Sequence, residues 1–207
     1  EISCSLVGSE MCIRDRKTTD QMPNLYIIAG CNGAGKTTAS FNVLPQILNC
    51  REFVNADEIA KGISPFAPET VAIQAGKLML ERIDTLLSEH VSFAIETTLA
   101  TRSYQSLVRK AKSMGYTVHL LFFWLESPEV ACSRVEKRVS EGGHNISTDV
   151  IFRRYYAGLN NLFKIFMPIV DYWALYDNNL QPKLVADNSG IFDKNLYNRI
   201  KNSYVGD

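Results

Sequence analysis

The sequence predicts an α/β fold built on a mostly parallel sheet. Short apolar runs alternate with longer segments of helical periodicity along residues 22–207, which is the pattern of strands joined by crossover helices. The runs are apolar at consecutive positions, as in residues 25–29, and this is typical of strands buried on both faces of a parallel sheet. Right-handed crossovers would place the connecting helices on both faces of that sheet.

About five strands and one hairpin partner are expected in chain order. The strands are 25–29, 53–55, 91–95, 116–124 and 173–176, with 183–186 returning beside the last of them across the turn 177–179. Helices are predicted at 68–89, 103–112, 127–140 and 148–166. The third helix has a clear start, with Ser127 as its cap, Pro128 at the first helical position and Glu129 in the first turn.

Composition excludes several classes of protein. No apolar run of the 207 residues approaches the ~20 residues needed to span a bilayer. Lys plus Arg and Asp plus Glu are balanced at 22 each, whereas a protein that coats nucleic acid is usually basic. The five cysteines include no CxxC pair, so neither a disulfide framework nor a zinc site is indicated, and a reducing, cytoplasmic location is expected.

Residues 1–21 do not belong with the rest of the chain. They show no helix or strand period and no basic-then-apolar signal segment. A back-translation of residues 10–16 resembles a transposon-end adapter used in sequencing libraries. We expect this tail to be disordered or artefactual, with the natural start at Met22 and a single domain over residues 22–207.

One motif carries strong chemical information. Residues 30–37 match GxxxxGK[ST] between an apolar strand and a helical stretch that begins near Gly35, which is the context of a phosphate-binding P-loop. Backbone N–H groups of such a loop surround phosphate oxygens, Lys36 would reach the β/γ-phosphates, and Thr37 would ligate Mg²⁺. The candidate nucleotide-binding residues are Gly30, Cys31, Asn32, Gly33, Ala34, Gly35, Lys36, Thr37 and Thr38.

The alternative for this segment is a glycine turn with a chance Lys-Thr pair, and Cys31 is expected only to present its backbone. The chain has no NKxD-type guanine reader, so ATP is the expected nucleotide.

Two acidic residues follow predicted strands and are expected near the P-loop. Asp57 comes just after the strand 53–55, and Glu96 ends the strand 91–95. In open α/β sheets ligands bind beyond the carboxyl ends of the strands, where a carboxylate could hold Mg²⁺ or take a proton from an attacking hydroxyl. Asp57 could instead cap a helix that starts at Glu58.

A basic segment is predicted to form a small helical lid over about residues 134–154. Arg134 and Arg138 lie four residues apart on one helix, Gly142-Gly143-His144 follow, and Arg153-Arg154 come next. Arginines that close over a moving phosphate stabilise its charge, and two glycines make a plausible hinge. The alternative is a solvated charged face, because Glu136 and Glu141 are interleaved. His144 has no second His or Cys at ligand spacing.

Taken together, Asn55-Ala56-Asp57-Glu58-Ile59, Glu96-Thr97-Thr98-Leu99 and Gly142-Gly143-His144, with the P-loop, resemble the zeta toxin family of P-loop kinases over about residues 22–190. The resemblance implies an adenylate-kinase-like core with a five-stranded sheet. It also implies ATP- and Mg²⁺-dependent phosphorylation of a small molecule, since well-known members phosphorylate the 3′-hydroxyl of the sugar in UDP-N-acetylglucosamine. An antitoxin protein is a further partner that the family implies.

The resemblance also assigns roles by motif. Asp57 matches the general base, Lys36 and Thr37 match the phosphate and Mg²⁺ groups, and Glu96 matches an acidic residue lining the substrate and metal site. The lid arginines correspond to Arg138 and to Arg153 or Arg154, and the acceptor site is expected to comprise Asp57, Glu96, Thr98 and Arg102. The P-loop departs from that of the well-known toxins at Cys31–Ala34, and residues 22–207 show no sign of the extended C-terminal region of larger toxins.

Two other functions compete with a kinase of nucleotide sugars. A kinase of polynucleotide or nucleoside ends would have a wide basic groove, which the balanced charge disfavours. A regulatory module that only binds ATP would not need the full set Lys36, Thr37, Asp57 and Glu96.

Overall fold

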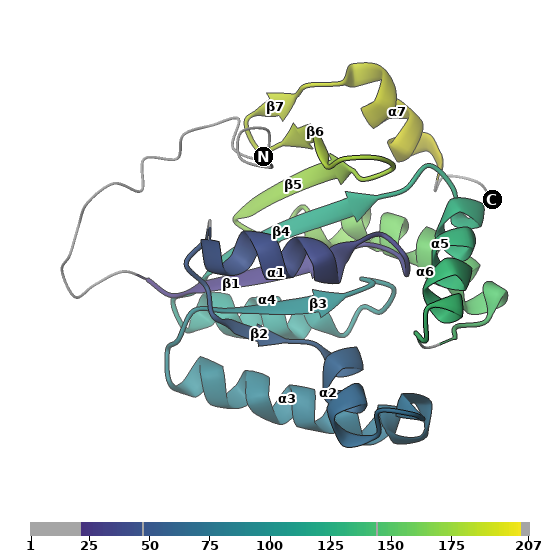
Figure 1. Cartoon of the computed structure of the whole chain (residues 1–207). Helices are drawn as coiled ribbons and strands as arrows, with labels where there is room; N and C mark the ends of the chain where they lie inside the picture. Colours follow the sequence, from purple (N-terminus) through teal and green to yellow (C-terminus); the bar gives the residue numbers. More distant parts are fainter. Residues whose placement is uncertain (1–21, 47, 144, 204–207) are drawn as a thin grey trace.

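The computed structural model describes residues 22–46, 48–143 and 145–203 (Figure 1). The tail 1–21, expected to be disordered or artefactual, and His144 of the predicted lid lie outside the described residues. Within the described ranges no helix combines the length and apolar character that a membrane crossing needs.

The core is a seven-stranded sheet in the order β2-β3-β1-β4-β5-β6-β7. Its strands are β1 Asn24–Ala29, β2 Glu52–Val54, β3 Phe93–Thr97, β4 Thr117–Trp124, β5 Tyr172–Asp177, β6 Lys183–Asp187 and β7 Gly190–Ile191. The first five strands of that order are parallel, β6 pairs antiparallel with β5, and β7 pairs antiparallel with β6. The mostly parallel α/β prediction is therefore confirmed.

The expected number of about five strands was too low. The hairpin partner is present as β6, but β7 has only two residues, too few to show a strand period. The third strand starts two residues later than predicted, at Phe93, and runs to Thr97.

Helices cover both faces of the sheet, as expected: Figure 1 shows α1 in front of it and α4 and α6 behind it. The helices are α1 Lys36–Gln46, α2 Ala56–Ile63, α3 Ala72–Ser88, α4 Tyr104–Ser113, α5 Pro128–Ser140, α6 Thr148–Asn161 and α7 Lys194–Ser203. A 3₁₀ turn, η1 (Pro68–Val71), leads into α3, and a π turn, η2 (Leu162–Phe166), extends α6. The sequence analysis did not predict α7, of which Ile200 is the one fully buried residue.

The sequence explains why β1 lies at the centre of the sheet. Five of its six residues are buried, because β3 and β4 pair with its two edges and helices cover both faces. The β1–β3 register places Ile28 beside Glu96 and Ala29 beside Thr97. Consequently the carboxyl end of β3 lies next to the loop that leaves β1, where parallel sheets place their ligands.

Candidate functional site

The loop between β1 and α1 has the backbone conformation that its glycines predict. Gly30, Gly33 and Gly35 all have positive φ values, of 145°, 76° and 77°. A Cβ at Gly30 would lie 2.3 Å from the carbonyl oxygen of Phe123 in β4, so no larger residue fits there. The motif thus forms a tight strand-to-helix connection, with α1 beginning at Lys36.

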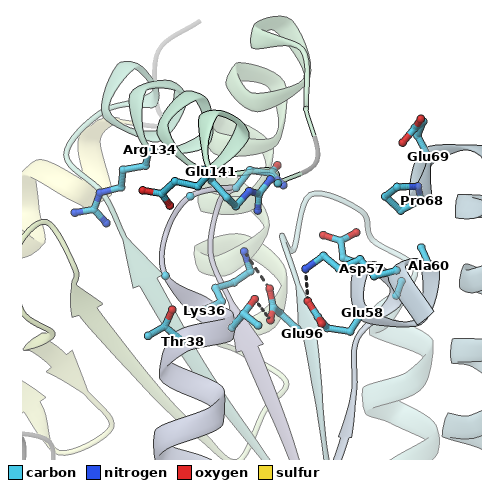
Figure 2. Close-up of a pocket in the computed structure, with 18 of the residues that line it drawn as sticks. Lys36, Thr38, Asp57, Glu58, Ala60, Pro68, Glu69, Glu96, Arg134 and Glu141 are labelled. Carbon is cyan, nitrogen blue, oxygen red and sulfur yellow. Dashed lines mark hydrogen bonds and ion pairs between the residues drawn. The ribbon is translucent and has the colours of Figure 1, made fainter. Parts of the chain in front are cut away.

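A buried network joins this loop to β3. Lys36 Nζ donates to the Cys31 carbonyl at 2.9 Å and lies 3.6 Å from Glu96 Oε1. Thr37 Oγ1 donates to Glu96 Oε2 at 2.8 Å, and Figure 2 marks this bond and the Lys36–Glu96 ion pair. The Lys36 and Glu96 side chains are only 7% and 9% exposed, so each charge depends on the other and on these hydrogen bonds for compensation.

Asn55 connects the same network to α2. Its Nδ2 donates to Glu96 Oε2 at 2.9 Å, and its Oδ1 accepts from the Asp57 backbone N–H at 2.8 Å. Asn55 is therefore the N-cap of α2, with extended backbone angles. The alternative in which Asp57 caps this helix is wrong, because Asp57 lies inside the first turn.

The Asp57 carboxylate is left available for other contacts. It accepts no hydrogen bond and forms no ion pair within the part of the chain that the structure describes. Figure 2 shows it on the α2 side of a cleft, with Arg134 and Glu141 of the α5 segment on the other side. A carboxylate at the first turn of a helix is also favoured by the helix dipole.

Two cavities meet at this network. The first, of about 600 Å³, lies between the P-loop, α2, η1 and the end of α5. The second, of about 820 Å³, lies between α3, the end of β3 and α4. Both are lined by Asn32, Lys36, Ala56, Asp57 and Glu96. These side chains can therefore contact a molecule in either cavity.

The second cavity combines an apolar wall with hydroxyl groups. Ile73 and Leu80 of α3 are 81% and 58% exposed and line it, and Thr98 and other hydroxyl side chains line the opposite side. Of the expected acceptor residues, Arg102 is exposed and is not among the residues that line either cavity.

The structure distinguishes the four arginines of the predicted lid by which cavity, if either, each one lines. Arg154 Nη1 donates to Asn32 Oδ1 of the P-loop at 3.2 Å, and Arg154 lines the second cavity. Arg153 is exposed and lines neither cavity. Arg138 lines the first cavity, and so does Arg134, whose Nη2 donates to the Asn179 carbonyl.

The two glycines that suggested a hinge have a specific structural role at the end of α5. Gly142 N–H donates to the Val139 carbonyl at 3.0 Å, and Gly143 N–H donates to the Arg138 carbonyl at 2.8 Å. With φ of 90° at Gly142, this is the Schellman motif that commonly ends helices. A Gly-Gly pair is therefore explained here without a hinge, although both residues also line the first cavity.

We expect Gly142→Ala to lower the free energy of unfolding by about 1 kcal/mol, because a Cβ is disfavoured at positive φ. Gly62→Ala is the matched control: Gly62 lies in α2, and a Cβ there would meet no atom within 4 Å, so alanine should be neutral or slightly stabilising. Urea denaturation of both variants measures the difference. Equal stabilities would contradict the capping role.

Cys31 is a structural rather than a reactive residue of the loop. It is 5% exposed, and burial raises the pKa of its thiol to about 11, although Lys36 and Arg134 partly oppose that shift. A raised pKa favours the neutral thiol, and the thiolate is the reactive form. The expectation that this position mainly presents its backbone agrees with the bond from Lys36 to its carbonyl.

We expect iodoacetamide to alkylate Cys31 at pH 8 roughly a hundredfold more slowly than an ordinary cysteine, since the thiolate fraction falls by that factor. The rate should rise with pH until about pH 11. Peptide mapping by mass spectrometry measures it, and the same protein in urea is the control. Equal rates in the folded and the unfolded protein would refute this account.

Thr37 and Glu96 provide oxygen atoms suited to Mg²⁺. Their side-chain oxygens lie 2.8 Å apart at the edge of the first cavity, and oxygen is the ligand that this ion prefers. Among the described residues no group of three or more His, Cys, Asp or Glu side chains is placed so that it could hold a metal ion by itself. The donor set therefore fits an ion bound by one or two protein groups together with phosphates.

Sequence reasoning gave no individual role to three residues that shape the site. Asn55 could have been found, because Asn directly before a helical segment is a capping signal. Arg134 was placed at the start of the predicted lid, but it was given no contact or role of its own. Asn178, whose Nδ2 donates to the Ala34 carbonyl at 2.6 Å, lies in the predicted hairpin turn and carries no sequence signal for such a contact.

Fold and site together define a P-loop kinase fold, with a phosphate-binding loop at the carboxyl edge of a parallel sheet. The family comparison is more specific: the model of the zeta toxin family matches residues 10–167. The chain belongs to the zeta toxin family. The match begins inside the segment 1–21, which the sequence analysis had set apart.

Individual relatives agree with this assignment. An uncharacterized protein of Haemophilus influenzae is 34% identical over 143 residues, covering 68% of this chain and 99% of that one. A structure from the PezAT toxin–antitoxin system of Streptococcus pneumoniae superposes with a TM-score of 0.68 at 19% identity, covering 92% of this chain and 82% of that one.

The complex of AvrRxo1-ORF1 and AvrRxo1-ORF2 with ATP gives a TM-score of 0.71 at 18% identity. The superposition covers 87% of this chain and 64% of the matched chain. At these identities the two solved structures show a shared fold.

Proposed function

We propose that this protein is an ATP-dependent phosphotransferase whose acceptor is a hydroxyl of a small molecule, a nucleotide sugar such as UDP-N-acetylglucosamine. One observation carries the proposal: Asp57 lines both the cavity at the P-loop and the neighbouring cavity beside α3. A general base must contact the acceptor hydroxyl while the nucleotide phosphates lie close by. An ATP-binding module without catalysis would not need that placement.

In this proposal the P-loop cavity holds the phosphates of ATP. Lys36 contacts the β/γ-phosphates. Thr37 and Glu96 would hold Mg²⁺, which would neutralise phosphate charge when bound. ATP binding agrees with the nucleotide in the AvrRxo1 complex. Residues 134–154 act as the lid, where Arg138 from α5 and Arg154 from α6 approach the phosphates from two sides. Arg153 has no part in this proposal.

The proposed step begins with the acceptor hydroxyl beside Asp57. Asp57 accepts the hydroxyl proton while the acceptor oxygen forms a bond to the γ-phosphorus. The bond between the γ-phosphorus and the bridging oxygen breaks, ADP leaves with that electron pair, and the positive charges of Lys36 and the arginines stabilise the transferring group.

Two features support a nucleotide sugar as the acceptor. The second cavity has a volume of about 820 Å³, within the range of sites for drug-sized molecules. Its hydroxyl groups suit a sugar, and the apolar wall with Ile73 and Leu80 suits the flat face of a base. Because the PezAT structure comes from a toxin–antitoxin system, an antitoxin protein is a proposed partner, and both would act in the cytoplasm.

The test is ATP turnover by the purified protein with a panel of acceptors: UDP-N-acetylglucosamine, the free sugar, uridine diphosphate, nucleosides and a 5′-hydroxyl RNA oligonucleotide. We expect acceptor-dependent ADP release and a phosphorylated product with the nucleotide sugar. Phosphorylation of RNA ends alone would replace the proposed acceptor class. No acceptor-dependent turnover with any of them, in a protein that binds ATP, would contradict the phosphotransferase proposal.

A further inference from the structure

The turn between β5 and β6 makes close contact with the P-loop. Asn178 is 8% exposed, and its Nδ2 donates to the Ala34 carbonyl at 2.6 Å, across 144 positions of the sequence. Its backbone N–H donates to the Trp124 carbonyl at 2.9 Å. A segment expected only to reverse the chain thus contacts both the P-loop and the end of β4.

The neighbours of Asn178 hold this turn in one conformation. Asp177 Oδ1 accepts from the Asn179 backbone N–H at 3.0 Å, and Asn179 Oδ1 accepts from the Glu126 backbone N–H at 3.0 Å. Arg134 of α5 donates to the Asn179 carbonyl. The turn is therefore fixed to the β4–α5 connection and to α5, and Asn178 has a rigid support.

The bond to Ala34 determines how one peptide group of the P-loop is oriented. In a planar trans peptide the carbonyl and the following N–H point in opposite directions. A donor that fixes the Ala34 carbonyl on the side of Asn178 therefore directs the Gly35 N–H to the opposite side. Gly35 lines the first cavity, and inward N–H groups are what a P-loop offers to phosphates.

The contact gives a second reason, besides the positive φ value, why position 35 is occupied by glycine. A Cβ at Gly35 would lie 2.7 Å from Asn178 Nδ2, closer than such atoms normally approach. Gly35 and Asn178 thus fit each other: the missing side chain at one position leaves room for the amide of the other.

We infer that Asn178 is a positioning residue for nucleotide binding, whose amide holds the Ala34–Gly35 peptide so that the Gly35 N–H faces the phosphates of the nucleotide. The inference rests on the proposed function only in taking ATP as the ligand. It assigns to the β5–β6 turn a part in the nucleotide site that the sequence motif does not contain.

The experiment compares Asn178→Ala and Asn178→Asp with Asn161→Ala. Asp is close to Asn in size but cannot donate when ionised. Asn161 is the matched control because it is 4% exposed and its Nδ2 donates to the Leu99 carbonyl at 2.9 Å; it lines neither cavity. Calorimetric titration measures the Kd of ATP, and hydrogen exchange of residues 30–37 without nucleotide reports the order of the loop.

We expect both Asn178 variants to raise the Kd of ATP about tenfold, as loss of one buried hydrogen bond predicts, and to exchange residues 30–37 faster. In steady-state kinetics the change should appear in the KM of ATP more than in kcat. Asn161→Ala should destabilise the fold with the ATP Kd and the exchange of residues 30–37 unchanged.

The inference is overturned by wild-type exchange of residues 30–37 in both Asn178 variants, or by the same increase in exchange in Asn161→Ala as in the Asn178 variants. An unchanged ATP Kd in variants that do exchange faster would also refute the link to binding. If the wild type itself binds no ATP, the proposed function fails, whereas the exchange comparison still decides whether Asn178 orders the loop.

Discussion

Asp57→Asn should lower phosphoryl transfer to the acceptor by roughly 10²–10⁴, the usual contribution of a positioned acid or base. Asparagine keeps the shape of the side chain but cannot accept the proton. The Kd of ATP with Mg²⁺ should hardly change, because the P-loop backbone, Lys36 and Thr37 do not depend on this carboxylate. The helix should also remain, since Asn55 caps it. Steady-state kinetics and ATP titration measure the two quantities.

Glu58→Gln is the control for this variant. Glu58 lies next to Asp57 in the same helical turn, lines the first cavity and pairs with Lys61 at 2.6 Å. Its charge is removed in the same way, so the control corrects for a general loss of negative charge in the cleft. Activity that survives Asp57→Asn would refute the assignment as a base. A parallel loss of ATP–Mg²⁺ affinity would instead indicate a metal ligand.

Lys36→Ala is expected to reduce transfer by at least roughly 10²–10³, the cost of losing one charge-stabilising group in an active site. The fold should persist, because the Glu96 carboxylate keeps the hydrogen bonds from Thr37 and Asn55. ATP should still bind to the loop backbone, more weakly. Single-turnover kinetics and thermal denaturation together separate the loss of catalysis from a loss of stability.

Lys61→Ala provides the comparison, since Lys61 lines the same cavity but forms a half-exposed ion pair with Glu58. Exposed pairs of this kind contribute little, so turnover should stay within about twofold. If Lys36→Ala folds and turns over within a few-fold of the wild type, its assignment to the phosphates fails.

The local part of the site was predictable from the sequence. The P-loop motif is contiguous, so Lys36 and Thr37 follow from residue order alone. Asp57 and Glu96 follow from a general property of parallel sheets, whose strand ends share one edge. The structure brings these four residues together along the first cavity; their roles in catalysis stay predictions.

The features of the site that could not be predicted depend on how helices are rotated about their axes and on contacts between segments far apart in the chain. Adjacent helical residues point about 100° apart, so whether Arg153 or Arg154 faces the P-loop depends on how α6 is seated against the core. The contact between Asn178 and Ala34 joins segments far apart in the chain, and no periodicity encodes it. The Gly142-Gly143 pair fits a cap or a hinge equally well until the backbone angles are known.

The order of strands in the sheet also bears on how the chain is made. Among the described strands of this sheet β1 is made first, yet both of its edges pair with strands that are made much later, β3 and β4. During synthesis its hydrogen-bonding groups and apolar side chains have no native partners, and unpaired edges of this kind favour aggregation. The P-loop of the nascent chain also lacks a native contact at this stage, because Asn178, which donates to the Ala34 carbonyl, lies in the turn after β5. A ribosome-bound chain should therefore complete its nucleotide site only after β5 and the turn that follows it have been made.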